Sequence, residues 1–145
     1  MTSNARTSFS RWLAWASAAL YAASLFSPAY YTESQAHYGL EALLLGSIGV
    51  LDGHFSWFAN PLLCASWFKR KAPTYGLSFA FAVPAFGLAV SFLLGEKIAV
   101  GSAGEYAYRA GTGYYLWLAS IGLAALAAWV CVPSTTQRAR SSDAA

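Results

Sequence analysis

The chain has 145 residues, of which 57% are hydrophobic, 17% aromatic and only 10% charged. A soluble domain usually carries about 25% charged residues, so this composition predicts a membrane protein with one compact domain. The two cysteines are too few for a disulfide scaffold. The nine lysines and arginines are scattered among apolar runs, so the net charge of +3 does not indicate a nucleic acid partner.

Polar clusters divide the chain into four apolar segments, at residues 9–31, 38–68, 74–94 and 113–132. Because a membrane-crossing helix needs about 20 mostly apolar residues, these segments predict an all-α, integral membrane four-helix bundle. We expect this single domain to cover residues 9–132. A short cytoplasmic segment at 1–8 would precede it, and a disordered cytoplasmic tail at 133–145 would follow.

The positive charges favour an orientation with both termini in the cytoplasm. That orientation leaves only Lys97 and Arg109 outside and places the other basic residues inside, as cytoplasmic loops prefer. A cleaved signal peptide is the alternative for the first segment, because Arg11 precedes a short apolar run and Ala29 is a small residue near its end. The bulky Trp15 within that run favours an uncleaved helix.

The second segment, residues 38–68, is too long for one upright span. A continuous helix of this length would measure about 46 Å, against a hydrocarbon core of about 30 Å, so we expect a long kinked helix. Pro61 leaves the carbonyl of Trp57 without its helical partner, which places the kink near these two residues.

Small residues are expected to share one face of this helix and to mediate packing, since membrane helices associate by close backbone approach. The second helix would then be the hub of the bundle. The third segment repeats the pattern at Gly76, Ala80, Pro84, Gly87 and Ser91, and the fourth at Gly113, Ser120, Ala124, Ala127 and Cys131. The predicted packing residues are Gly46, Gly49, Gly53, Ser56 and Gly87.

Four polar residues interrupt the second segment: Glu41, Asp52, His54 and Asn60. An acid at mid-bilayer costs on the order of 2.5 to 3.5 kcal/mol, so Asp52 should face the interior, lie at an interface or be protonated. Two interpretations stay open, a buried polar cluster that stabilises the bundle and a polar path for protons or ions. Asn60 is expected to bond across a helix interface or to the carbonyl that Pro61 frees.

No motif in the sequence indicates catalysis, a metal or a cofactor. Gly-x-Ser-x-Gly and His-Glu-x-x-His are both absent from the sequence. Asp52 and His54 would point in different directions on a helix, which disfavours a shared metal ion. We therefore expect a protein that is not an enzyme.

The outer loop at residues 95–112 contains the β-prone runs KIAV and EYAYR around GSAG. This pattern predicts either a small outer β-hairpin or an ordered loop.

The segments GLEALLLGSIGVLDGHFSWFANPLL and GTGYYLWLAS, with Glu105 between them, resemble a recurring pattern of small, uncharacterised four-span bacterial inner-membrane proteins. The resemblance covers residues 39–120 and implies a multi-pass protein of the inner membrane, but no known activity. We expect a non-enzymatic accessory or protein-interaction component, such as an assembly or immunity factor. Its partners would be the lipid bilayer and a membrane protein or a second copy. The alternative is a small transporter or channel subunit that uses Asp52.

Overall fold

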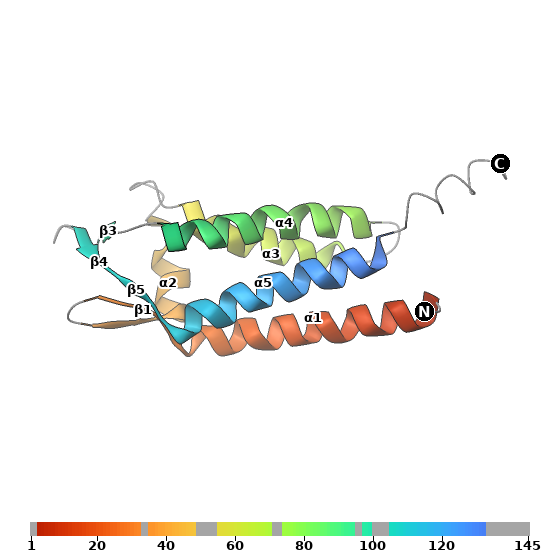
Figure 1. The fold of residues 1–145 in the computed structure, drawn as a ribbon, viewed down its shortest axis with the longest axis horizontal. Helices are drawn as coiled ribbons and strands as arrows, with labels where there is room; N and C mark the ends of the chain where they lie inside the picture. Colours follow the sequence, from red (N-terminus) through yellow and green to blue (C-terminus); the bar gives the residue numbers. More distant parts are fainter. Residues whose placement is uncertain are drawn as a thin grey trace.

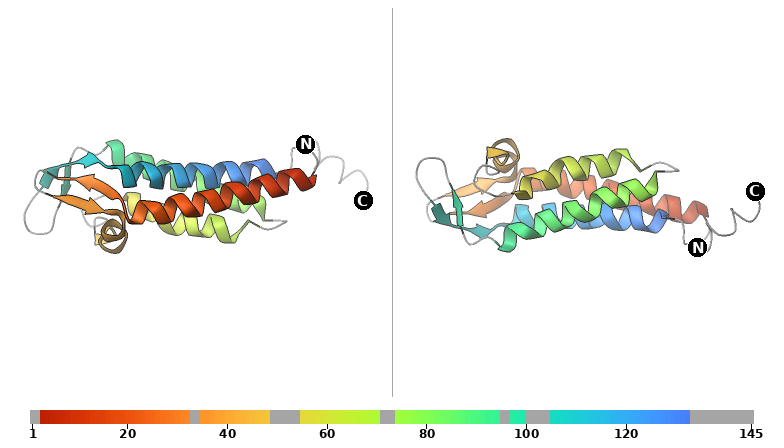
Figure 2. Two further views of the ribbon diagram at one scale, coloured as in Figure 1. Left: turned by 90° about the horizontal axis from the view of Figure 1, so that it is seen from below. Right: turned by 90° about the horizontal axis from the view of Figure 1, so that it is seen from above.

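The computed structural model describes residues 3–32, 35–48, 55–70, 74–94, 97–99 and 105–132. Its main body is a helical bundle with a cap of short strands at one end (Figure 1). The start of the first helix and the end of the last helix both lie at the opposite end (Figures 1 and 2). The bundle helices are α1 (Ser3–Leu25), α3 (Ala59–Phe68), α4 (Tyr75–Ser91) and α5 (Thr112–Cys131). The predicted helical bundle is therefore present.

The first and last helices, α1 and α5, pack against each other along most of their length (Figure 2). Each contributes small residues spaced seven apart, a repeat that keeps one line of side chains on a shared seam. The buried members are Ser10, Ser17 and Ser24 on α1, and Gly113, Ser120 and Ala127 on α5. Ser17 Oγ donates to the Ser120 carbonyl at 2.7 Å, and Ser10 Oγ donates to the Ala127 carbonyl at 2.7 Å. The small face predicted for α5 is thus confirmed.

The single kinked helix predicted over residues 38–68 is wrong. Helix α2 (Gly39–Leu45) ends at a turn around Gly46, and the chain resumes in the 3₁₀ helix η2 (Phe55–Phe58), which leads into α3. Helix α2 lies across the cap end of the bundle rather than along it (Figures 1 and 2). It is held there because the Gly39 N–H donates to the Ser27 carbonyl at 3.0 Å. The change from η2 to α3, next to Pro61, does fall at the predicted kink.

Helix α4 faces its neighbours with a different side from the predicted one. Gly87 is exposed, and a Cβ added there would meet nothing within 4 Å, so its predicted packing role is wrong. Alanine already permits close approach, so the alanine face of α4 packs against α3 and α5 while the glycines stay outside. The buried residues of α4 are Ser78, Ala82, Ala85 and Ala89. The hub is α5, which packs against α1, α3, α4 and the first strand, so the prediction that the second segment is the hub is also wrong.

The cap contains two small antiparallel sheets. Strands β1 (Pro28–Tyr31), β2 (Ala36–Tyr38) and β5 (Arg109–Ala110) form a sheet in the order β2-β1-β5, which the sequence did not predict. Strands β3 (Lys97–Ala99) and β4 (Glu105–Ala107) pair with each other, with Ile98 opposite Tyr106, so the hairpin rather than the ordered loop is the alternative that forms here.

Glycine is required where α1 and α5 meet the cap. A Cβ on Gly113 would lie 2.6 Å from the Ser27 carbonyl oxygen, and one on Gly111 would lie 2.3 Å from that of Pro28. These contacts bring the β5–α5 corner directly onto the α1–β1 corner, so the three-stranded sheet begins where the α1–α5 seam ends.

Among the described helices, two are long and apolar enough to cross a membrane: Tyr75–Leu94, which is α4 with the 3₁₀ turn η3 (Phe92–Leu94), and Thr112–Cys131. Helix α1 has 23 residues and is about 35 Å long, but it is less apolar. Helix α3 has 10 residues and is about 15 Å long, which is short of a hydrocarbon core of about 30 Å. The four-span arrangement therefore stays a prediction.

Candidate functional site

Asn60 is at the centre of a polar cluster inside the bundle. Its Oδ1 accepts hydrogen bonds from Tyr21 Oη on α1 at 3.2 Å and from Trp117 Nε1 on α5 at 2.9 Å. Its Nδ2 donates to the Trp57 carbonyl at 3.0 Å, the group that Pro61 deprives of a helical partner. One amide thus joins three helices and satisfies a broken helical turn, so Asn60 makes both of the bonds that were expected as alternatives.

A second set of hydroxyl bonds ties the other end of α3 to its neighbours. Trp67 Nε1 donates to Ser17 Oγ at 3.1 Å, so Ser17 bonds both α3 and α5. Ser78 Oγ on α4 donates to the Ser66 carbonyl at 2.8 Å. Every one of these bonds is internal to the bundle, and each is made by a side chain that is buried or half-buried. These hydrogen bonds therefore stabilise the packing of the helices against one another.

Glu41 lies at the cap end, in a separate cluster. His37 Nδ1 and Glu41 Oε1 are 2.9 Å apart, and the His37 ring stacks on Tyr30 with a centroid distance of 4.7 Å. On the other side of the ring, Thr32 Oγ1 lies 3.4 Å from His37 Nε2. Burial, with a smaller contribution from the negative charge of Glu41, raises the pKa of the Tyr30 phenol. This cluster fastens the start of α2 to the sheet.

The hydroxyl, imidazole and carboxylate of this cluster follow the order of a nucleophile, a base and an orienting acid. The hydroxyl belongs to Thr32, however, and it is also within 3.3 Å of the Gln35 carbonyl, to which it donates. A proton committed to that carbonyl is not aimed at the imidazole, so the arrangement supports the turn between β1 and β2 rather than nucleophilic attack.

Aromatic rings connect this cluster to the C-terminal end of α4 and the N-terminal end of α5. Phe92 lies between Tyr108, at a centroid distance of 4.5 Å, and Tyr114, at 5.3 Å. The Tyr108 hydroxyl donates to the Phe92 carbonyl, and burial raises the pKa of this phenol. Tyr30 contacts both Phe92 and Tyr108 edge-on or tilted. The cap is consequently packed onto the bundle as one ordered unit.

The predicted polar path is not assembled among the described residues. Glu41 bonds His37 in the cap, whereas Asn60 bonds Tyr21, Trp57 and Trp117 in the bundle, and no described hydrogen bond links the two groups. The other two predicted members, Asp52 and His54, lie outside the described residues, as do the packing glycines Gly49 and Gly53.

The remaining predicted packing residues have different environments. A Cβ added to Gly46 would lie 2.7 Å from Trp57 Cδ1, so this glycine does pack closely, although at a turn rather than within a long helix. Ser56 is half-buried in η2.

Two features of the bundle were not predicted from the sequence. The serine line of α1 was missed, although the seven-residue spacing of Ser10, Ser17 and Ser24 is visible in the sequence. Arg70 was treated only as an orientation signal, yet its Nη2 donates to the Ser10 carbonyl at 2.7 Å and to Ser10 Oγ at 2.9 Å. No sequence pattern signals that second contact, because the two residues are brought together only by packing.

Comparison of the chain with known protein families, with characterised proteins and with solved structures finds no match. The resemblance to small four-span bacterial proteins therefore stays a prediction. What the fold and the clusters define is a class, a helical bundle with an internal hydrogen-bond network and a small β-cap.

Proposed function

We propose that this chain is a multi-pass membrane protein without catalytic activity, which holds its bundle in the bilayer and presents the β-cap to a protein partner. The cap would lie outside and the two termini in the cytoplasm. In this arrangement α1, α4 and α5 cross the bilayer, and η2 with α3 belongs to the fourth crossing.

One observation carries the membrane part of the proposal: helix α1 has serines on its inner face and tryptophans on its outer face. On α1, Ser17 is fully buried while Trp12 and Trp15 are 73% and 72% exposed. In the two most apolar helical segments, Tyr75–Leu94 and Thr112–Cys131, only 22% and 33% of the most apolar stretch is buried. A soluble bundle would bury these side chains, whereas lipid solvates them and leaves hydroxyl groups to bond between helices.

The contact part of the proposal is supported by the order and chemistry of the cap. Strand β2 forms an edge of the three-stranded sheet, and an unpaired strand edge can accept a strand from another protein. At the opposite edge of this sheet, Arg109 on β5 lies over the Tyr31 ring at 5.4 Å from its centroid, so the cap also carries a cation. By contrast, the bundle interior is filled by fully buried residues such as Leu63 and Ile121, which favours a structural role over a conducting path.

The membrane arrangement is tested by extraction and labelling. Alkaline washing of membranes should leave the full chain in the pellet. With Cys64 and Cys131 replaced by alanine, a cysteine at Ala36 in the cap should react with a membrane-impermeant maleimide in intact cells. A cysteine at Asn4 should react only after permeabilisation. Release of the chain by alkali would refute membrane embedding, and equal labelling of both positions would refute the orientation.

The contact proposal is tested by photo-crosslinking in cells. A photoreactive residue at Ala36 or Ala107, both exposed in the cap, should give discrete protein adducts, while the same residue at Leu126 on the outer face of α5 should give mainly lipid adducts. If the cap positions yield no protein adduct while the chain is correctly embedded, the partner-binding role is wrong.

A further inference from the structure

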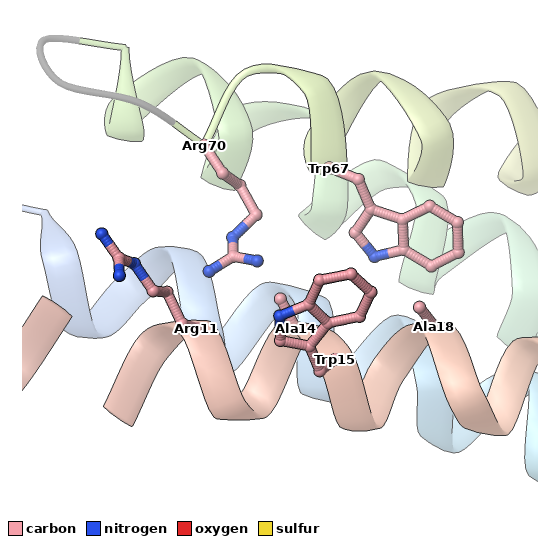
Figure 3. Close-up of a pocket in the computed structure, with 6 residues that line it drawn as sticks. All are labelled: Arg11, Ala14, Trp15, Ala18, Trp67 and Arg70. Atoms are coloured by element: carbon pink, nitrogen blue, oxygen red, sulfur yellow. The ribbon is translucent and has the colours of Figure 1, made fainter. Parts of the chain in front are cut away.

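A groove opens between α1 and the end of α3, at the end of the bundle opposite the cap (Figure 3). Its volume is about 260 Å³. The lining residues are Arg11, Ala14, Trp15 and Ala18 from α1, Trp67 from α3, and Arg70, which follows the end of α3. In Figure 3 the guanidinium of Arg70 reaches down toward α1, and the two indoles lie farther along the groove. The groove therefore has a cationic end and an aromatic, apolar remainder.

Arg70 is held in place but is not neutralised. Both of its described bonds, to the carbonyl and the hydroxyl of Ser10, use Nη2. Its Nε is buried and has no hydrogen-bond partner among the described residues. Burial lowers the pKa of this guanidinium, because the charged form loses hydration. A bound anion would replace part of the lost hydration.

The described part of the chain offers no nearby carboxylate to fill that role. None of the helices α1, α3, α4 and α5 contains an aspartate or a glutamate. Glu41 on α2 lies at the cap end, with His37. Two arginines thus line one groove while the four bundle helices supply no negative charge, so the complementary anion has to come from outside the bundle.

We propose that this groove binds the phosphate of an anionic phospholipid, with the phosphate at Arg11 and Arg70 and the first part of an acyl chain against Trp15, Trp67 and Ala18. This proposal rests on the membrane embedding proposed above. Guanidinium groups bind phosphate through paired, charge-assisted hydrogen bonds, and basic pockets between helices on the cytoplasmic side suit anionic headgroups. The volume admits a headgroup phosphate and the start of a chain, while the rest of the lipid stays in the bilayer.

The apolar part of the groove distinguishes a lipid from a free anion. A soluble phosphate would use only the arginine end and leave two indoles and two alanines uncovered. A phospholipid covers both parts at once, and tryptophan favours the headgroup level of a bilayer, where this end of the bundle would lie.

The test uses the purified full chain in mild detergent, titrated with phosphatidylglycerol or with phosphatidylcholine of the same acyl chains, with bound lipid counted by native mass spectrometry. We expect phosphatidylglycerol to bind about tenfold more tightly. Arg11→Gln should weaken phosphatidylglycerol binding by about fivefold or more, and Arg70→Lys, which keeps the charge but loses the planar fork, should weaken it as well. The matched control is Arg6→Gln, because Arg6 is an exposed arginine of α1 that does not line the groove.

Equal affinity for the two lipids would overturn the proposal, and so would equal losses in the Arg6 and Arg11 variants. Excess inorganic phosphate provides a further arm: if it displaces the lipid completely, the site binds a soluble anion and the lipid assignment is wrong. Helicity measured by circular dichroism identifies an unfolded Arg70 variant, in which case the Arg11 variant alone decides. A chain that stays in alkali-washed membranes but shows no lipid preference refutes only this site, whereas a chain that washes out refutes the embedding itself.

Discussion

Replacing Asn60 by leucine should destabilise the bundle by about 2 kcal/mol. The side chain makes two bonds to other helices, from Tyr21 at 3.2 Å and from Trp117 at 2.9 Å, and one local bond to the Trp57 carbonyl at 3.0 Å. Bonds between membrane helices average about 0.6 kcal/mol and reach about 1.7 kcal/mol. Leucine has a similar size, so the change removes hydrogen bonds without opening a large cavity.

Pro61 allows the contribution of the local bond to be separated from the other two. In the Asn60→Leu background, Pro61→Ala supplies an N–H for the Trp57 carbonyl and should recover about 1 kcal/mol. In the wild-type background the same change should recover much less, because the Asn60 amide already serves that carbonyl. The double-mutant cycle should therefore give a coupling of about 1 kcal/mol.

The free energy of unfolding can be measured by titrating mixed micelles with a denaturing detergent and following helicity. The matched control is Asn4→Leu, an identical change at an exposed position of α1, which should have little effect. Stability of the Asn60 variant within about 0.5 kcal/mol of wild type would refute a structural role for the cluster. A Pro61→Ala effect of equal size in both backgrounds would refute the account of the freed carbonyl.

Three further changes can be measured by the same unfolding assay. Gly46→Ala should lower stability by about 1 kcal/mol or more, since the new Cβ would lie 2.7 Å from Trp57 Cδ1; an unchanged midpoint would contradict this contact. Gly87→Ala should leave stability unchanged or raise it by about 0.5 kcal/mol, because nothing lies within 4 Å, and a clear loss would restore the packing role denied to Gly87 above. Ser17→Ala should lower the free energy of unfolding by about 1 to 2 kcal/mol, because it removes the bond from α1 to the Ser120 carbonyl on α5 and the acceptor of Trp67 Nε1. If the Ser17 and Asn60 clusters are independent, this loss should add to the loss caused by Asn60→Leu.

The α5 face and the Asn60 bonds were predictable because they depend on local chemistry. Small residues recur along α5 at helical spacing, so one face of that helix could be assigned without knowing its partner. Pro61 necessarily frees the carbonyl of Trp57, and Asn60 is the nearest amide able to reach it.

The break in the second segment and the face of α4 depend on tertiary contacts that no periodicity encodes. Apolar residues continue well past the end of α2, but the helix is held across the bundle by the bond from Gly39 to Ser27 and by the pair of His37 and Glu41. On α4 the glycines were expected on the packing face, but Ala85 is buried and Gly87 is exposed, because alanine is also small enough for close approach. The three-stranded sheet was missed because strands of two to four residues are too short for an alternating pattern.

The pairing of α1 with α5 has a consequence for biogenesis. If the helices enter the bilayer in the order of synthesis, α1 has to wait there until nearly the whole chain has left the ribosome before its long-term partner arrives. During that interval the hydroxyl of Ser17 can turn back to a carbonyl of its own helix, as serine does in apolar surroundings, and later exchange this bond for the Ser120 carbonyl. A nascent chain arrested before Thr112 would therefore leave the buried serine face of α1 without the helix α5 that covers most of it, although the bonds from α1 to α3 could already form.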